Sequence, residues 1–253
     1  MVVLLATMRK ELISFLFSPV AYIIAVVLYL LRGLEVNGLV RMAIEAQWDV
    51  DTFVNYYVIG GTTTNLFFIL VPPILTMRFF AEEKRTGSLE VLMTAPVRDF
   101  EIVLGKWLAA VVFYGLLWLP TILLLGVLSG EAFIGQGFHL GPIFSAYLGL
   151  FLLGGMLLAV GLFTSSLTDN VLLASMLAMI FNYGLLSAPQ VFHASLGDSH
   201  AASVIREQTN VGEHLWSWFG RGQIDTSKVV FYVAGMMFFL FLTTRSLESR
   251  KWR

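Results

Sequence analysis

The sequence contains no cysteine, which excludes a disulfide framework, thiolate catalysis and zinc sites built on cysteine pairs. Charged residues are also scarce: they make up 13% of the 253 residues, well below the ~25% of an average soluble domain. The formal net charge is −1, so the strongly basic surface that selects nucleic acids is missing. The remainder is mainly apolar, 57% of the chain, and this composition indicates a membrane protein.

Motifs for catalysis and cofactor binding are missing as well. No G-x-x-x-x-G-K-[ST] run occurs, so the chain does not cradle a nucleotide by itself. The stretch "GGTTTN", Gly60 to Asn65, begins with glycine but has no such lysine. Nucleophile-elbow and H-E-x-x-H patterns are also lacking, and no histidine pair has a metal-binding spacing. We therefore expect no catalytic, cofactor-binding or metal site in this chain.

Long uncharged runs predict the membrane spans, because a charge at the centre of a spanning helix costs roughly 2.5–3.5 kcal/mol. About 20 apolar residues cross a ~30 Å hydrocarbon core. Six runs meet this condition, and they predict spans at residues 17–33, 53–78, 106–129, 143–165, 170–191 and 228–246. No run has a charged residue at its centre, so we expect no proton relay or buried ion pair within the spans. The sequence predicts an all-α membrane protein with one transmembrane domain over residues 1–253.

Several residues within the spans predict local geometry. Pro72-Pro73 removes two amide donors from the second span and should bend it. The polar run from Thr62 to Asn65 either lines a cavity or bonds to a neighbouring helix, and the second reading is favoured. Small residues four apart let the fourth span pack closely against its neighbours; these pairs are Ser145/Gly149 and Gly155/Ala159.

The first residues, "MVVLLATMRKELISFLF", form a pattern of their own. Apolar residues recur there at helical spacing: Leu5, Met8, Leu12 and Phe15. Lys10 and Ser14 fall on the opposite side, which predicts an amphipathic helix in the membrane interface. A plain helical lead-in to the first span fits the pattern equally well.

Lysine and arginine indicate the orientation. With both termini in the cytoplasm, eleven of the sixteen basic residues lie inside and five outside, as the positive-inside rule requires. The charged segment from Phe79 to Trp107 then faces the cytoplasm, as does the short turn "TSSLTDN" between the fourth and fifth spans. In the last outer connection, Trp216, Trp218 and Phe219 predict an interfacial anchor or a short surface helix.

The charged segment, "FFAEEKRTGSLEVLMTAPVRDFEIVLGKW", predicts a short helix between the second and third spans. Gly87 permits a bend before it, and Pro96 ends it because proline lacks an amide donor. An apolar cluster lies between them: Leu89, Val91, Leu92 and Met93. A half-apolar helix with a charged rim suits insertion into a partner's groove. The pattern is equally compatible with a helix that rests on lipid headgroups.

The sequence resembles a known family in two places. "AEEKRTGSLEVLMTAPVRDFEIVLGKWLAA" is similar to the signature of ABC-2-type permeases, the membrane subunits of ATP-binding-cassette transporters. "RGQIDTSKVVFYVAGMMFFLFLTTRSLESRKWR" resembles the end of the gliding-motility-type permease branch. Ser88 and Met93 stand where Thr and Leu are expected, and neither change removes the helix. Gln223 replaces a residue that is more often apolar.

The resemblance implies that Ser88 to Val97 is a coupling helix that docks into a separate ATPase. The residues it assigns to ATPase binding are Glu82, Glu83, Arg85, Gly87, Ser88, Leu89, Glu90, Leu92, Met93, Thr94, Pro96, Val97, Ser166 and Asp169. It also implies a bacterial inner-membrane complex of two permease copies and two ATPases. ATP and Mg²⁺ would be bound by the ATPases, and an extracytoplasmic auxiliary protein would be a further partner.

Two other classes fit the sequence. A non-transporting scaffold would anchor soluble partners without moving any compound, and a channel or secondary transporter would move substrate without an ATPase. The uncharged spans and small outer loops favour an amphipathic or lipid-linked cargo over a small ion. Transmission of force or signal to an outer partner is compatible with the same pattern.

Overall fold

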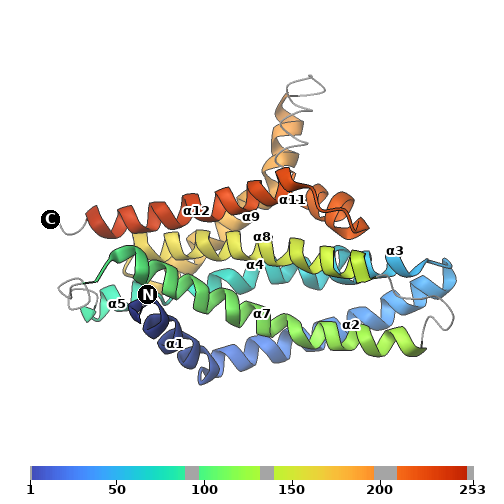
Figure 1. Ribbon diagram of the computed structural model, residues 1–253, viewed down its shortest axis with the longest axis horizontal. Helices are drawn as coiled ribbons and strands as arrows, with labels where there is room; N and C mark the ends of the chain where they lie inside the picture. Colours follow the sequence, from blue (N-terminus) through green and yellow to red (C-terminus); the bar gives the residue numbers. More distant parts are fainter. Residues whose placement is uncertain (1, 89–96, 132–139, 197–209, 250–253) are drawn as a thin grey trace.

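The computed structural model describes the backbone of residues 2–88, 97–131, 140–196 and 210–249, and the long elements in these ranges are helices that run side by side (Figure 1). The first and last described residues lie at the same end of the bundle, together with α5 and the start of α7 (Figure 1). The elements are α1 (Val2–Leu16), α2 (Pro19–Glu45), α3 (Val50–Asn55), η1 (Tyr56–Gly60), α4 (Thr62–Thr76), α5 (Ala81–Arg85), α7 (Asp99–Glu131), α8 (Leu140–Leu167), α9 (Val171–Leu196), α11 (Val211–Glu213), η2 (His214–Trp218), η3 (Phe219–Arg221) and α12 (Thr226–Glu248).

Five helices of the described chain are long and apolar enough to cross a membrane, whereas the sequence predicted six. They are Pro19–Glu45, Val50–Arg85, Asp99–Gly126, Leu140–Leu167 and Thr226–Glu248. The predicted span at residues 170–191 falls on α9 (Val171–Leu196), in which Val171–Ser187 is the apolar stretch whose side chains are described. The far part of α9 also leaves the bundle (Figure 1). Six spans are therefore not confirmed.

α1 is a separate helix that packs along α7. It ends where Ser18 is extended (φ −82°, ψ 122°) and Pro19 opens α2, a first-turn position that suits proline because its fixed φ is already helical. Phe15 stacks on Phe113 with ring centroids 5.1 Å apart. The predicted apolar face is only partly right: Leu5 is exposed, whereas Glu11 lies on the half-buried side.

α2 continues well beyond the predicted end of the first span at residue 33, as far as Glu45. Arg32 and Arg41, which the sequence placed in an outer connection, therefore lie within this helix. Arg32 is buried, and its side chain pairs with Glu35 at 3.0 Å. Pairing removes much of the penalty of a charge in an apolar bundle, so the helix continues past it. The prediction that the spans hold no buried ion pair is wrong.

The second span is interrupted at Gly61 rather than at its prolines. Tyr56–Gly60 forms a π-helical turn, and Gly61 is extended (φ −68°, ψ 144°), whereas α4 is continuous through Pro72 and Pro73. Thr64 hydroxyl accepts a hydrogen bond from Arg32 Nη1 at 3.0 Å and donates to the Val58 carbonyl at 3.1 Å. The polar run at 62–65 thus joins α2 across the break, as the favoured interpretation predicted.

α8 lies at the centre of the bundle and contacts α4, α7, α9 and α12. Its small residues make this possible, as predicted. A Cβ at Gly154 would lie 2.3 Å from the ring of Tyr114, and one at Gly161 would lie 2.1 Å from Thr76 Oγ1. Neighbouring helices therefore approach α8 to a distance that only glycine permits.

At the opposite end, the aromatic run predicted to anchor at the surface folds back onto α8. η2 and η3 bury Leu215 and Phe219 against Gly149. Trp216 meets the ring of Tyr56 edge-on at 4.7 Å. These residues are a short helical segment, as predicted, but they close the bundle end instead of lying free.

The start of α12 is fixed by its cap. Asp225 accepts a hydrogen bond from the Ser227 amide at 2.9 Å, which satisfies one of the free donors of the first turn. This bond holds the pKa of the Asp225 carboxyl below its ordinary value. α12 then runs back along α8 to the end that holds α1 and α5 (Figure 1).

We predict that Gly154→Ala destabilises the protein by about 1–3 kcal/mol, because the buried Tyr114 ring cannot yield space for the new methyl group. Thermal unfolding of the purified chain in detergent measures this effect. Gly184→Ala is the matched control, since nothing lies within 4 Å of its Cβ position and alanine favours the helix. Equal stability of the two variants would contradict close packing at α8.

Candidate functional site

The segment from Met77 to Ser88 connects the second span to the predicted coupling helix. Phe79, Phe80 and Ala81 are buried, and the short helix α5 begins at Ala81 and ends at Arg85. Gly87 has φ +72°, in the left-handed region where glycine is favoured at the residue after a helix C-cap. The bend predicted at Gly87 is confirmed.

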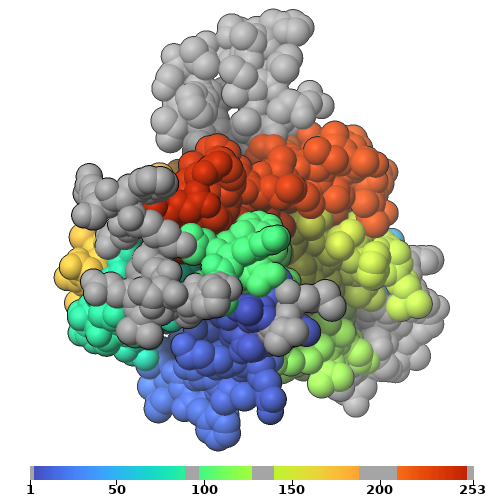
Figure 2. Space-filling model, turned by 60° about the vertical axis from the view of Figure 1, so that its left-hand side comes forward, coloured from blue at the N-terminus to red at the C-terminus, as the bar shows by residue number. Residues whose placement is uncertain are grey.

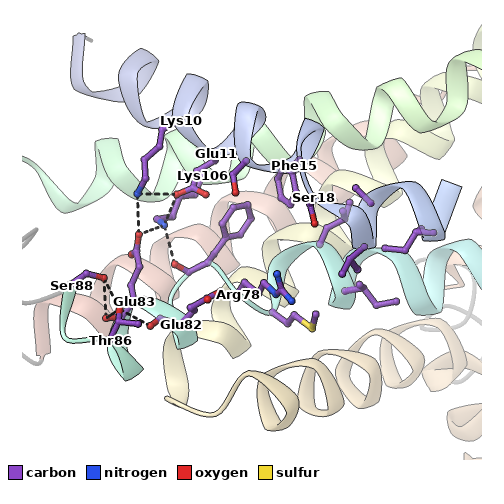
Figure 3. A pocket seen from close by; sticks show the side chains of 18 residues that line it. Lys10, Glu11, Phe15, Ser18, Arg78, Glu82, Glu83, Thr86, Ser88 and Lys106 are labelled. Carbon is purple, nitrogen blue, oxygen red and sulfur yellow. Dashed lines mark hydrogen bonds and ion pairs between the residues drawn. The ribbon is translucent and has the colours of Figure 1, made fainter.

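A buried lysine holds this segment to two other helices. Lys106, near the start of α7, is 1% exposed. Its Nζ donates to Glu11 Oε1 of α1 at 2.9 Å, to Glu83 Oε1 of α5 at 2.7 Å and to the Phe79 carbonyl at 2.9 Å. The same ammonium lies 5.1 Å from the centroid of the Phe80 ring, within cation–π distance. One charge thereby joins α1, α5 and α7 (Figure 3).

Burial makes these partners obligatory. An ammonium taken out of water loses several kcal/mol of solvation, which only close and hydrogen-bonded counter-charges restore. Lys10, by contrast, is 73% exposed in its side chain and lies 3.8 Å from both carboxylates. Lys10 therefore lies at the solvent-exposed edge of this charged cluster, and Lys106 lies at its centre.

The other side of the segment is held by the end of α8. The amides of Phe80 and Ala81 donate to Ser165 Oγ at 3.1 and 3.2 Å, and that hydroxyl donates to the Met77 carbonyl at 3.1 Å. Lys84 Nζ donates to the Ser166 carbonyl. The turn at 165–170 holds Ser166 and Asp169 of the predicted ATPase contact. It is thus in direct contact with the α5 segment, which holds other residues of that contact.

The carbonyl oxygen of Ser166 also accepts a hydrogen bond from Ser246 Oγ of α12, at 3.3 Å. Figure 2 shows this end of the molecule: α1 and α2 in blue, α5 in teal, the start of α7 in green and the end of α12 in red share one face. We name the set of contacts made by Lys106, Ser165 and Ser166 the junction.

The predicted ATPase-binding residues divide into three groups. Arg85, Gly87, Ser88 and Asp169 are exposed, and Glu82 is half-buried on the same face. Glu83 and Ser166 are engaged inside the junction, and Val97 packs partly buried against the core. The remaining six lie outside the described residues: Leu89, Glu90, Leu92, Met93, Thr94 and Pro96. Binding of an ATPase by any of them stays a prediction.

Four junction residues were missed by the sequence reasoning: Glu11, Lys84, Lys106 and Ser165. Lys106 carried a weak signal, since it is a lone lysine at the boundary of an apolar run. Outside the junction, the pair Arg32 and Glu35 carried a stronger sequence signal, because opposite charges three residues apart on a helix are expected to pair. Ser165 had no signal, since its role depends on backbone amides of another segment.

Beside the junction lies a cavity of about 430 Å³ between α1, α2, α5 and the end of α4 (Figure 3). Charged and hydroxyl side chains line one side, among them Lys10, Arg78 and Glu83, and apolar residues such as Ile24 and Leu75 line the other. Within the described residues, no group of three His, Cys, Asp or Glu side chains is placed to hold a metal ion.

The chain is thus an all-helical membrane protein with five candidate spans in its described part and a buried polar junction at one end. The family of ABC-2 family transporter proteins matches residues 46–206, more than half of the chain. The chain therefore belongs to this family and is a transporter membrane component without an ATPase domain. Comparison with curated proteins gives no match. The matched range includes α5 and the turn at 165–170, whereas α1 and α12 lie outside it.

We predict that Lys106→Met lowers the free energy of unfolding by about 3–5 kcal/mol, because Glu11 and Glu83 are left near one another without their counter-charge. Thermal and denaturant unfolding in detergent measure the change. Lys10→Met is the control and should alter stability by less than about 1 kcal/mol, since this lysine is exposed.

A triple variant separates charge from shape. Adding Glu11→Gln and Glu83→Gln to Lys106→Met removes the unpaired carboxylates and should restore more than half of the loss. If the triple variant were no more stable than Lys106→Met, the electrostatic account of the junction would fail.

Proposed function

We propose that the chain is the permease subunit of an ATP-binding-cassette transporter, driven by a separate ATPase that docks on residues 82–97 and on the turn at 165–170. The observation that carries this proposal is the junction. The segment entering the predicted coupling helix is bonded to α1 and α7 through Lys106 and to α8 through Ser165. A push on that segment is therefore delivered to three helices at once.

Membership of the ABC-2 family supports the ATPase partner. Four residues of the predicted contact are exposed, so a soluble subunit has access to them: Arg85, Gly87, Ser88 and Asp169. Salt-sensitive contacts from Arg85 and Asp169 would surround the apolar residues of the coupling helix, an arrangement typical of interfaces. ATP and Mg²⁺ belong to the ATPase in this proposal, and this chain binds neither.

The complex contains two copies of the permease in a bacterial inner membrane, with both termini in the cytoplasm. Exposed apolar side chains on α2 and α9, including Leu30, Leu34 and Ile180, leave large surfaces for lipid or a second copy. The end of the chain resembles the gliding-motility branch, so the work performed is either export or force transmitted to an outer partner. An amphipathic or lipid-linked cargo is favoured.

Docking is tested by co-expression with the ATPase of the same complex. Glu90→Lys and Leu92→Arg should reduce recovery of the ATPase with the purified permease by at least about tenfold, since a buried wrong-sign charge opposes association by several kcal/mol. Arg221→Glu is the control: its neighbour Gly222 lies against Pro142 at the start of α8, whereas the junction lies at the end of α8. Unchanged recovery for both coupling-helix variants would favour a scaffold that holds no ATPase there.

Transmission is tested apart from docking. Ser165→Ala combined with Lys84→Met removes the bonds between the α5 segment and α8 while leaving the docking residues in place. We expect the ATPase to be recovered normally and ATP-dependent transport in vesicles to fall by about tenfold or more, because interactions at such a junction contribute a few kcal/mol. Transport at the full rate would show that the junction is not the path of coupling.

A further inference from the structure

The cavity beside the junction has walls of two kinds. Its volume, about 430 Å³, falls within the ~300–1,000 Å³ of small-molecule sites. Val20 and Ile24 of α2 and Ile74 and Leu75 of α4 form an apolar wall that continues along two candidate membrane spans. Ser14, Thr86 and the charged residues form the other wall. Such a site is suited to a molecule with a polar head and an apolar body.

Two charged groups of the cavity have unused bonding capacity. Arg78 is exposed, lines the cavity beside the charged cluster (Figure 3), and its guanidinium has no hydrogen bond or ion pair within the described part of the chain. Glu83 uses Oε1 to bind Lys106, while its Oε2 is buried and has no hydrogen-bond partner. A buried acceptor without a donor is unfavourable by about 1–3 kcal/mol. The cavity therefore offers a cation to an anionic group and a carboxylate oxygen to an N–H donor.

The balance of charges narrows the occupant further. Three cationic side chains line the cavity together with three carboxylates: Lys10, Arg78 and Lys106 with Glu11, Glu82 and Glu83. This balance suits a zwitterion better than a free anion, which the carboxylates would repel. A primary ammonium can donate to Glu83 Oε2, whereas a quaternary ammonium has no N–H to donate.

We propose that this cavity binds a phospholipid whose headgroup carries a phosphate and a primary ammonium, as phosphatidylethanolamine does. The phosphate pairs with Arg78, the ammonium donates to Glu83 Oε2, and an acyl chain lies against α2 and α4. The bound lipid touches the same carboxylate that holds Lys106, so it stabilises α5 in the position from which the predicted coupling helix begins. This site is independent of the identity of the transported cargo and of the ATPase.

The test is a binding comparison on the purified full chain in detergent micelles, with native mass spectrometry and thermal unfolding as readouts. The probes are phosphatidylethanolamine, phosphatidylcholine, phosphatidylglycerol and soluble glycerophosphoethanolamine. We expect phosphatidylethanolamine to bind about tenfold more tightly than phosphatidylcholine, the size of one charge-assisted hydrogen bond, and to raise the unfolding temperature as a ligand of the folded state does. The soluble headgroup should bind far more weakly, because it lacks the chain that covers the apolar wall.

Three variants assign the contacts. Arg78→Gln should weaken all three phospholipids by about tenfold, and Arg85→Gln, an exposed arginine outside the cavity, is its matched control. Glu83→Gln should abolish the preference for phosphatidylethanolamine over phosphatidylcholine, because the amide that replaces the carboxylate cannot attract the ammonium. Glu11 remains as the counter-charge of Lys106, and thermal unfolding without lipid checks that the variant is folded. Ala21→Phe fills the cavity without altering a charge and should reduce binding of every phospholipid alike.

Each remaining outcome would overturn the proposal. Equal binding of phosphatidylcholine would show that no N–H donor is recognised, and stronger binding of phosphatidylglycerol would indicate an anion site instead. Binding of the soluble headgroup as tightly as the lipid would show that the apolar wall contributes nothing. A failed ATPase-recruitment experiment leaves this test unaffected, because no ATPase is present in it.

Discussion

The arrangement of this end of the molecule depends on a single buried ammonium. Lys106 begins an apolar span, and its charge has to be matched by carboxylates brought from α1 and α5. Matching it requires that residues 11, 83 and 106 meet, which fixes α1 along α7 and holds α5 in place. An apolar residue at position 106 would remove that requirement.

α8 holds the α5 segment on the side opposite to Lys106. Its glycines allow Tyr114 of α7 and Thr76 of α4 to approach the backbone, and its last turn presents Ser165 to the amides of the α5 segment. Interiors packed this closely transmit displacement instead of absorbing it. The chain belongs to a family of transporter membrane proteins, and in the proposed function the junction would carry motion from one end face to the spans.

Most of the helices could be predicted from the sequence, because the penalty for a charge in lipid acts residue by residue and leaves uncharged runs wherever a helix spans. The errors arise where tertiary contacts changed that penalty. Arg32 was treated as the end of a span, but Glu35 and Thr64 compensate its charge and α2 continues. The span predicted on α9 is not confirmed, since the apolar stretch described there is Val171–Ser187.

The sequence by itself determined the all-helical membrane class, the bend at Gly87 and the small residues of α8. These follow from local preferences and transfer energies, which a window of neighbouring residues contains. Only the tertiary structure decided which charges are paired, that the second span breaks at Gly61 and that a two-sided cavity lies beside Glu83. Those features depend on distances between segments far apart in the chain, and no local pattern encodes such distances.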